Sequence, residues 1–131
     1  MIVVEGPIKG KARPRLGKFT TYTPDDTVNY ENWVKICYQQ QDGRHFLNEP
    51  IRAEIKVYHK VPKSYSKKRI EGIRQGLERP QKKPDADNIA KIILDSLNGI
   101  AYKDDSQVIE LQVSKFFTFD TERVEFELGE I

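Results

Sequence analysis

The sequence is poor in the residues that build disulfide bridges and zinc sites. Its 131 residues include one cysteine, Cys37, and two histidines, His45 and His59. One thiol cannot form an internal bridge, and these three side chains fall short of the four ligands of a structural zinc site. Zinc fingers and disulfide scaffolds are therefore excluded. A chain of this length can bury enough apolar surface to fold without such crosslinks.

Long hydrophobic runs are also missing. No apolar stretch approaches the ~20 residues of a membrane span, and the start, MIVVEGPIKGK, lacks the basic, apolar and small-residue regions of a signal peptide. We therefore expect an intracellular, cytoplasmic protein that makes no membrane contact. Because no repeat, linker or low-complexity tract interrupts the sequence, we expect residues 1–131 to form a single domain.

The small net charge of +2 hides a strong segregation of charge along the chain. Residues 1–51 carry seven basic and six acidic side chains, residues 52–83 carry eleven and three, and residues 84–131 carry four and eleven. Segregation of this size favours a basic surface for a polyanion beside an acidic cluster with another role. Ordinary solvated surface charge is the alternative interpretation.

Periodic apolar residues predict an α+β fold in which helices pack on a mixed sheet. Strict alternation over residues 51–60 is typical of a half-buried strand. We expect a β-α-β-α-α-β-β order, with a strand at 1–5, a helix after Thr23-Pro24, a strand at 51–60, helices at 66–79 and 87–97, and strands at 107–117 and 122–128. The region around Asp120 and Thr121 predicts a hairpin between the last two strands.

The same patterns predict the core. The expected inward residues are Tyr30, Trp33, Val34 and Cys37 in the first helix, Ile70, Ile73 and Leu77 in the second, Ile89, Ile92, Ile93 and Leu97 in the third, and Ile109, Leu111 and Val113 in the strand at 107–117. His59 continues the inward side of its strand, and we interpret it as a structural histidine with satisfied hydrogen bonds. Cys37 is predicted to be a buried, inert thiol.

Two aspartates and a lysine meet at the start of the helix at 87–97. Pro84 disfavours helical geometry at the residue before it and Asp87 is a good helix cap, so Asp85 should lie in extended chain, where its side chain can converge with that of Asp87. Lys91 follows Asp87 by about one helical turn and lies on the same side.

A second acidic pair, Asp104 and Asp105, precedes the strand at 107–117. Asp105 shares the parity of the residues expected to face the helices, so it is the better candidate for a shared site, with Asp104 as support. Three converging carboxylates need a cation among them, and oxygen ligands suit Mg²⁺, with Mn²⁺ as a substitute. Together with Lys91 they indicate metal-assisted phosphoryl chemistry. The structural alternative makes them a helix cap, loop residues and a salt-bridge partner.

Residues 83–115, KPDADNIAKIILDSLNGIAYKDDSQVIELQVSK, resemble the signature of the RusA family of Holliday junction endonucleases. That family has a D-x-D-N-x-x-K helix start, then D-x-L, then D-D-x-Q-V before a strand ending in lysine. The matching positions are Asp85, Asp87, Asn88, Lys91, Asp95, Leu97, Asp104, Asp105, Gln107, Val108 and Lys115. The opening GPIKGKARPR is similar to the family's G-x-P-x-x-K-x-R-P-R, whereas residues 19–48 match nothing diagnostic.

The resemblance implies a homodimeric, Mg²⁺-dependent nuclease of recombination and repair that resolves four-way DNA junctions by paired nicks, uses no nucleotide cofactor and comes from a bacterium, phage or prophage. It implies that Asp85, Asp87 and Asp105 bind metal and that Lys91 assists catalysis. The basic residues then become candidate DNA contacts: Lys9, Lys11, Arg13, Arg15 and Lys18 in a loop, and Lys67, Lys68, Arg69 and Arg74 in a helix. Phe19, Tyr22 and Tyr65 are candidates for stacking on splayed bases.

Four rival functions stay open from the sequence. A non-catalytic junction-binding protein would use the carboxylates structurally, and a general nuclease would lack junction selectivity. A PD-(D/E)xK nuclease is disfavoured because the only E-x-K, Glu54 to Lys56, precedes Asp85 and lies on an outward strand face. A small-molecule phosphohydrolase with an Asp85 nucleophile would leave the basic segment without a role.

Overall fold

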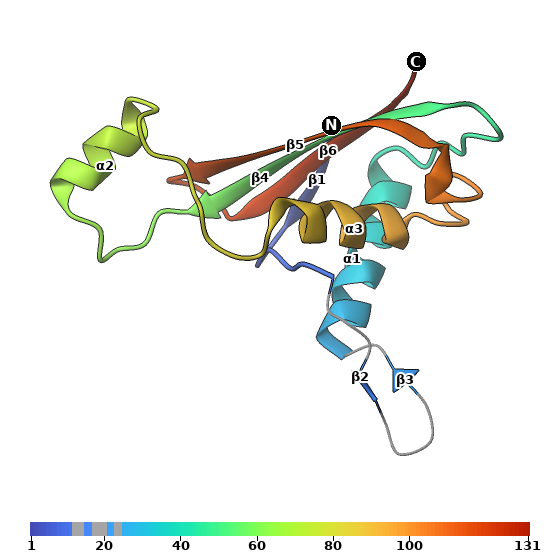
Figure 1. Ribbon diagram of the computed structural model, residues 1–131, viewed down its shortest axis with the longest axis horizontal. Helices are drawn as coiled ribbons and strands as arrows, with labels where there is room; N and C mark the ends of the chain where they lie inside the picture. The colour runs from blue at the N-terminus through green and yellow to red at the C-terminus, as the bar shows by residue number, and fades with distance from the viewer. Residues whose placement is uncertain (12–14, 17–20, 23–24) are drawn as a thin grey trace.

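The computed structural model describes residues 1–11, 15–16, 21–22 and 25–131, with side chains at 1–11 and 27–131. Its elements are β1 (Ile2–Glu5), β2 (Arg15–Leu16), β3 (Thr21–Tyr22), α1 (Asp25–Gln41), β4 (Ile51–Lys60), α2 (Lys67–Arg74), α3 (Ala86–Ser96), the 3₁₀ turn η1 (Asp105–Gln107), β5 (Val108–Thr118) and β6 (Arg123–Glu130). The predicted α+β order is confirmed, with the short strands β2 and β3 and the turn η1 added (Figure 1).

The main sheet is mixed and has the strand order β1-β6-β4-β5. The strand β4 lies inside it, parallel to β5 and antiparallel to β6, and its side chains alternate between buried and exposed as expected. The predicted hairpin between the last two strands is wrong, because β4 separates β5 from β6. Both strands pair with β4, and the connection between them crosses its end.

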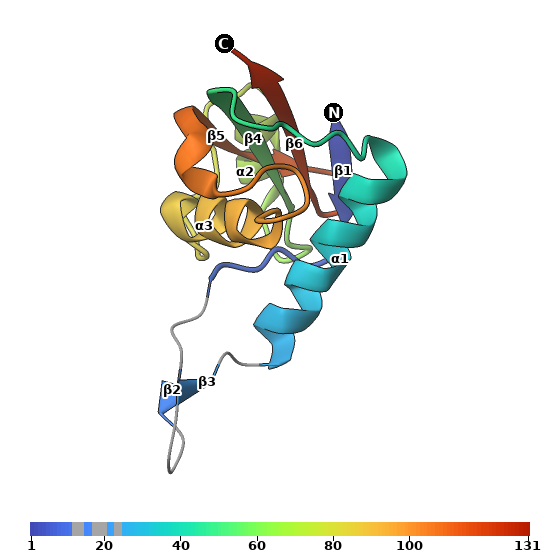
Figure 2. The same cartoon turned by 90° about the vertical axis from the view of Figure 1, so that its right-hand side faces the viewer.

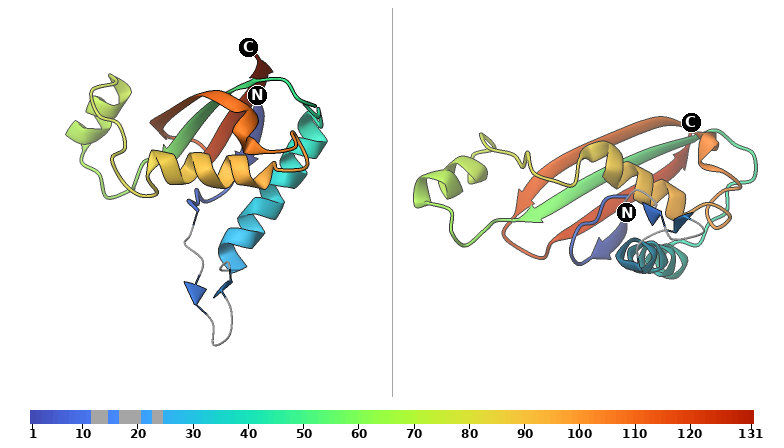
Figure 3. Two further views of the ribbon diagram at one scale, coloured as in Figure 1. Left: turned by 45° about the vertical axis from the view of Figure 1, so that its right-hand side comes forward. Right: turned by 60° about the horizontal axis from the view of Figure 1, so that its bottom comes forward.

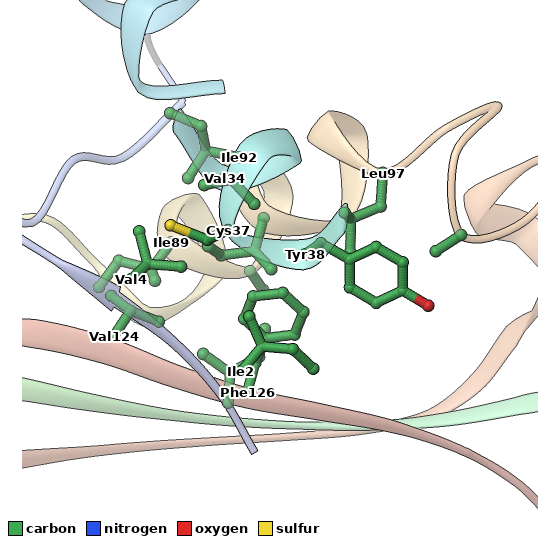
Figure 4. Packing of buried hydrophobic residues seen from close by; sticks show 14 of the residues in the cluster. Ile2, Val4, Val34, Cys37, Tyr38, Ile89, Ile92, Leu97, Val124 and Phe126 are labelled. Carbon is green, nitrogen blue, oxygen red and sulfur yellow. The ribbon is translucent and has the colours of Figure 1, made fainter. Parts of the chain in front are cut away.

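Two helices cover one face of this sheet and leave the other face open (Figure 2). The stripe of α3 is fully buried: Ile89, Ile92 and Ile93 are each 0% exposed, as is Leu97 just after the helix. These residues pack with Val34 and Cys37 of α1 and with Val4, Val124 and Phe126 of the sheet (Figure 4). Burial of this apolar surface is the main stabilising contribution to the fold.

The prediction that Trp33 is a core residue is wrong, since its side chain is 43% exposed. Its Nε1 donates a hydrogen bond to the Glu5 carbonyl, 2.9 Å away. Gln41, on the same helix, donates to the Val3 carbonyl and accepts from the Val3 amide. These contacts satisfy backbone groups at the free edge of β1, a position that would otherwise be open to another strand.

Three other expected core residues are exposed. Leu77 is 79% exposed because α2 ends at Arg74 and Gly76, at φ 76°, turns the chain. Ile109 and Leu111 are 62% and 49% exposed. They lie on β5, an edge strand whose register with β4 shifts near its start, so the alternation expected there does not hold.

His59 is buried as predicted, at 2% exposure, but its hydrogen bonds are not all satisfied. Its Nε2 has no partner among the described residues, and its Nδ1 lies 3.6 Å from Glu122 Oε1. Burial, assisted by the positive charges of Lys115 and Lys82, lowers the pKa of His59 to about 4. The imidazole is therefore a neutral core group at physiological pH.

The helix α2 stands apart from the sheet on two connecting segments, an arrangement we call the arm, residues 61–85 (Figure 3). Ser66 caps this helix by accepting a hydrogen bond from the Arg69 amide. The strands β2 and β3 pair with each other and project away from the sheet (Figures 1 and 2).

The chain after β1 lies directly on the first turn of α3. The Lys11 amide donates to the Asn88 carbonyl at 3.0 Å, and a Cβ on Gly10 would lie 2.8 Å from Pro84 Cβ and 3.0 Å from Asn88 Cβ. Only glycine permits this approach without displacement of one segment.

We predict that Gly10→Ala lowers the free energy of unfolding by about 1–3 kcal/mol, as expected for overpacking. Gly72→Ala is the matched control, because a Cβ at this α2 position meets nothing within 4 Å. That change should be neutral or stabilising by up to about 1 kcal/mol. Urea denaturation of the two variants checks both values, and equal effects would contradict the close packing at Gly10.

Candidate functional site at the two ends of α3

The first carboxylates lie at the start of α3. Asp85, not Asp87, occupies the N-cap position, and Asp87 lies in the first turn. This corrects the predicted cap, because the helix begins at Ala86 and not after Asp87. The Asp85 side chain makes no capping hydrogen bond, so its carboxylate is free beside the positive end of the helix dipole. Lys91, one turn further on, is exposed.

A lysine on β5 holds the segment that precedes Asp85. Lys115 Nζ donates to the Pro84 carbonyl at 3.0 Å and to the Lys82 carbonyl. Partial burial lowers the pKa of Lys115, while the nearby Asp85 carboxylate opposes that effect. The family-like lysine at the end of the motif is therefore a structural clamp between β5 and the start of α3.

A pocket of about 380 Å³ opens beside Asp85. Three lysines contribute to its lining, namely Lys9, Lys11 and Lys83, together with Gly10 and Asn88. A concave site with several ammonium groups beside one carboxylate is chemically suited to a phosphate group and a cation.

The second acidic pair lies at the start of the 3₁₀ turn η1, with Asp104 at its N-cap position in extended geometry and Asp105 as its first residue. Asp104 caps this turn by accepting from the Ser106 amide. Hydrogen bonding to the Ser106 side chain, and then to its amide, lowers the pKa of Asp104. Gln107 closes the capping box from its other side and also donates to the Phe46 and Glu49 carbonyls. Asp104 therefore stabilises the turn, and its support of a shared metal site stays a prediction. Strand parity does not explain the position of Asp105.

Asp105 faces Asp95, in the last turn of α3. Partial burial raises the pKa of Asp105, and the Asp95 carboxylate, within hydrogen-bonding range, raises it further. Lys11 Nζ lies 3.6 Å from Asp95 Oδ2 and 3.1 Å from Glu31 Oε2. The ammonium of Lys11 therefore partly offsets the negative charge that gathers at this end of the helix.

The predicted convergence of Asp85, Asp87 and Asp105 is not seen within one chain. Asp85 and Asp95 are separated by ten residues, which is about 15 Å of helix at 1.5 Å per residue, and Asp105 lies with Asp95. Among the described side chains, no three acidic, histidine or cysteine residues lie close enough to hold a metal ion. The carboxylates form two separate groups, one at each end of α3.

Some of the predicted DNA contacts are exposed cations, whereas others already contact carboxylates or an aromatic ring within the chain. Lys9, Lys67 and Lys68 are exposed, whereas Lys11 pairs with Glu31 and Asp95. Arg69 pairs with Glu78 at 2.5 Å, and the Arg74 guanidinium lies over the Phe119 ring. Arg13 and Lys18, like Phe19, lie outside the described residues, and the side chains of Arg15 and Tyr22 do as well.

Sequence reasoning assigned no chemical role to Asp95, Glu31 or Lys115. A signal existed for two of them, since Asp95 and Lys115 both match the family motif. Glu31 carried none, because its contact with Lys11 depends on how α1 crosses the segment after β1.

The chain is similar in sequence to proteins of one known family. The family model described as Endodeoxyribonuclease RusA matches residues 5–128. The uncharacterized protein YqaN of Bacillus subtilis (strain 168) is 37% identical over 131 residues, covering 98% of this chain and 90% of that protein. In the described part of the chain, no helix has the length and apolar character needed to cross a membrane. With a family match over nearly its whole length and the motif residues gathered around α3, the chain belongs to the RusA family of endodeoxyribonucleases.

Proposed function

We propose that the protein is a divalent-metal-dependent endodeoxyribonuclease that resolves four-way DNA junctions by paired nicks in the cytoplasm. The observation that carries this proposal is the uncapped Asp85 carboxylate at the start of α3, beside a pocket lined by Lys9, Lys11 and Lys83. In a chain of the RusA family, this combination supports a site where a DNA phosphate meets a carboxylate-bound cation.

The donor chemistry suits the proposed metal. Asp85, Asp87 and Asp105 offer only carboxylate oxygens, the ligands that Mg²⁺ and Mn²⁺ prefer. A bound cation would supply charge stabilisation to the reacting phosphate, and we assign Lys91 to assist beside it. Because one chain holds Asp85 and Asp105 at opposite ends of α3, we infer that the complete ligand set forms between the two chains of a homodimer.

Asp85→Asn and Asp105→Asn are each expected to retain junction binding and to lose Mg²⁺-dependent cleavage. The loss should be at least roughly 100-fold, the upper range for removing even an outer-shell partner of a metal. Asp42→Asn is the matched control, because its retained oxygen can still accept from the Arg44 amide. Binding and nicking are measured on a synthetic four-way junction with and without Mg²⁺ or Mn²⁺.

The same assay separates the rivals. Wild-type protein that binds the junction but never nicks it would favour the non-catalytic binding protein. One observation also favours that function: the described side chains of one chain contain no group of three carboxylates. Equal cleavage of linear duplex would instead make the protein a general nuclease.

For the homodimer, we expect a mass near twice 15.2 kDa by sedimentation equilibrium at assay concentrations. We also expect that mixing Asp85→Asn chains with Asp105→Asn chains restores nicking at one of the two sites. A mixed dimer would retain one site with both aspartates if each site draws Asp85 from one chain and Asp105 from the other. Mixtures that stay inactive despite chain exchange, or a strictly monomeric protein, would contradict the shared site.

The exposed cations of α2 are expected to contact DNA phosphates. Each phosphate contact contributes about 0.9 to the slope of log affinity against log salt concentration, so Lys67→Gln with Lys68→Gln should flatten that slope by nearly 2. Lys56→Gln serves as control, since Lys56 faces the open side of the sheet and lies 3.7 Å from Glu54. A salt slope unchanged by the double substitution would return Lys67 and Lys68 to ordinary surface charge.

A further inference from the structure

A second pocket, of about 320 Å³, lies between the arm and the end of β5. It is lined by Tyr65, Arg69, Glu78, Arg79, Gln81, Lys82 and Phe117. Its three cations outnumber its one carboxylate, and two aromatic rings lie among them. None of the family-motif carboxylates lines this pocket, so it is distinct from the sites at the two ends of α3.

The aromatic rings of the pocket are held in fixed orientations. Tyr65 and Phe117 meet edge to face, with ring centroids 6.0 Å apart. The Arg69 guanidinium lies 3.6 Å from the Tyr65 ring centroid and is held there by Glu78, whose Oε1 lies 2.5 Å from Arg69 Nη2. Glu78 therefore orients Arg69 on the ring, while both aromatic side chains stay only half buried.

The segment that leads into α3 contributes to the lining of this pocket. Lys82 contributes to its lining, while Lys83, Pro84 and Asp85 line the pocket described above. The two pockets thus flank one four-residue segment. The Lys115 ammonium fixes this segment by donating to the Lys82 and Pro84 carbonyls. Phe117 follows two residues later on the same face of β5. A DNA strand whose phosphate lies beside Asp85 would pass the aromatic pocket within a nucleotide or two.

We propose that this pocket binds one unstacked nucleobase of the DNA strand that crosses the 82–85 segment. The inference rests on the proposed function and extends it with a base-binding subsite. The Arg69 guanidinium held on the Tyr65 ring offers a planar stacking surface to any base, and neighbouring cations hold the phosphates on either side. Gln81 adds an amide that can pair with a base edge. A branched junction supplies bases with incomplete stacking, which linear duplex does not.

The test uses four-way junctions whose nucleotides next to the branch point are either normal or abasic. Binding is measured in EDTA, so that no cleavage occurs. Wild-type protein should bind the normal junction about five-fold to 100-fold more tightly than the abasic one, the range expected for stacking of one base. Tyr65→Leu retains side-chain bulk but removes the ring, and it should reduce this ratio towards one.

Tyr58→Leu is the matched control. Tyr58 stacks on Phe116 at 5.5 Å on the opposite face of the sheet, outside the pocket, so its loss should leave the ratio at the wild-type value. Thermal unfolding of both variants verifies that each is folded. Where Tyr65→Leu destabilises the arm, Gln81→Ala provides a second variant with the same expected direction.

Two results would overturn the subsite. One is a wild-type ratio near one, and the other is a Tyr65→Leu variant that weakens binding to both junctions equally, which would assign Tyr65 to arm packing alone. Failure of the proposed function looks different, because it shows as absent cleavage of the normal junction with Mg²⁺ while the binding ratio in EDTA still reports on the pocket.

Discussion

The ammonium group of Lys115 joins the main sheet to the segment that leads into α3. Its two hydrogen bonds to the Lys82 and Pro84 carbonyls join the edge strand β5 to the end of the arm. Without them the long connection from α2 would have few anchors, since α2 itself stands away from the sheet. Because Asp85 follows directly, the same bonds place the free carboxylate of the α3 cap.

The helix α3 then acts as a rigid spacer between two acidic groups. Its buried stripe fixes it against α1 and the sheet, so neither end can move independently. At one end Asp85 shares a pocket with lysines, and at the other Asp95 pairs with Lys11 and lies beside Asp105. If the proposed metal site needs both groups, the second must come from another chain, and for this reason our proposal links the metal site to a homodimer.

Sequence patterns predicted the parts of the fold that depend on local periodicity. The stripe of α3 and the alternation of β4 were both confirmed, because each element lies inside the layered core, where burial follows parity or helical spacing. The predictions that Trp33 and Ile109 are buried were wrong for a common reason: each side chain lies at an edge of the sheet. At an edge, tertiary packing and not local periodicity decides what a side chain contacts. Trp33 donates a hydrogen bond to a backbone carbonyl, and Ile109 stays exposed.

The candidate site was predictable in its residues but not in their arrangement. Asp85 and Asp105 carry the family motif, yet their separation follows from the length of α3 and from the 3₁₀ turn that replaces the expected strand at Asp105. Similarly, five cations were predicted in the amino-terminal loop, but the engagement of Lys11 with Glu31 depends on the path of α1. Contacts between distant segments of this kind leave no periodic trace in a sequence.

In the folded protein, the charges that are segregated along the sequence also differ between the faces of the molecule. Its open face carries Glu5, Glu54, Glu110, Glu125 and Glu127 against Arg52, Lys56, Lys60 and Arg123, and three of these cations pair with carboxylates on that face. Such a face offers no excess positive charge to a polyanion. The exposed Lys9, Lys67 and Lys68 lie instead near α3 or on the arm. If DNA binds as we propose, it meets positive charge beside Asp85 and on the arm, whereas the glutamates of the open face of the sheet disfavour binding there.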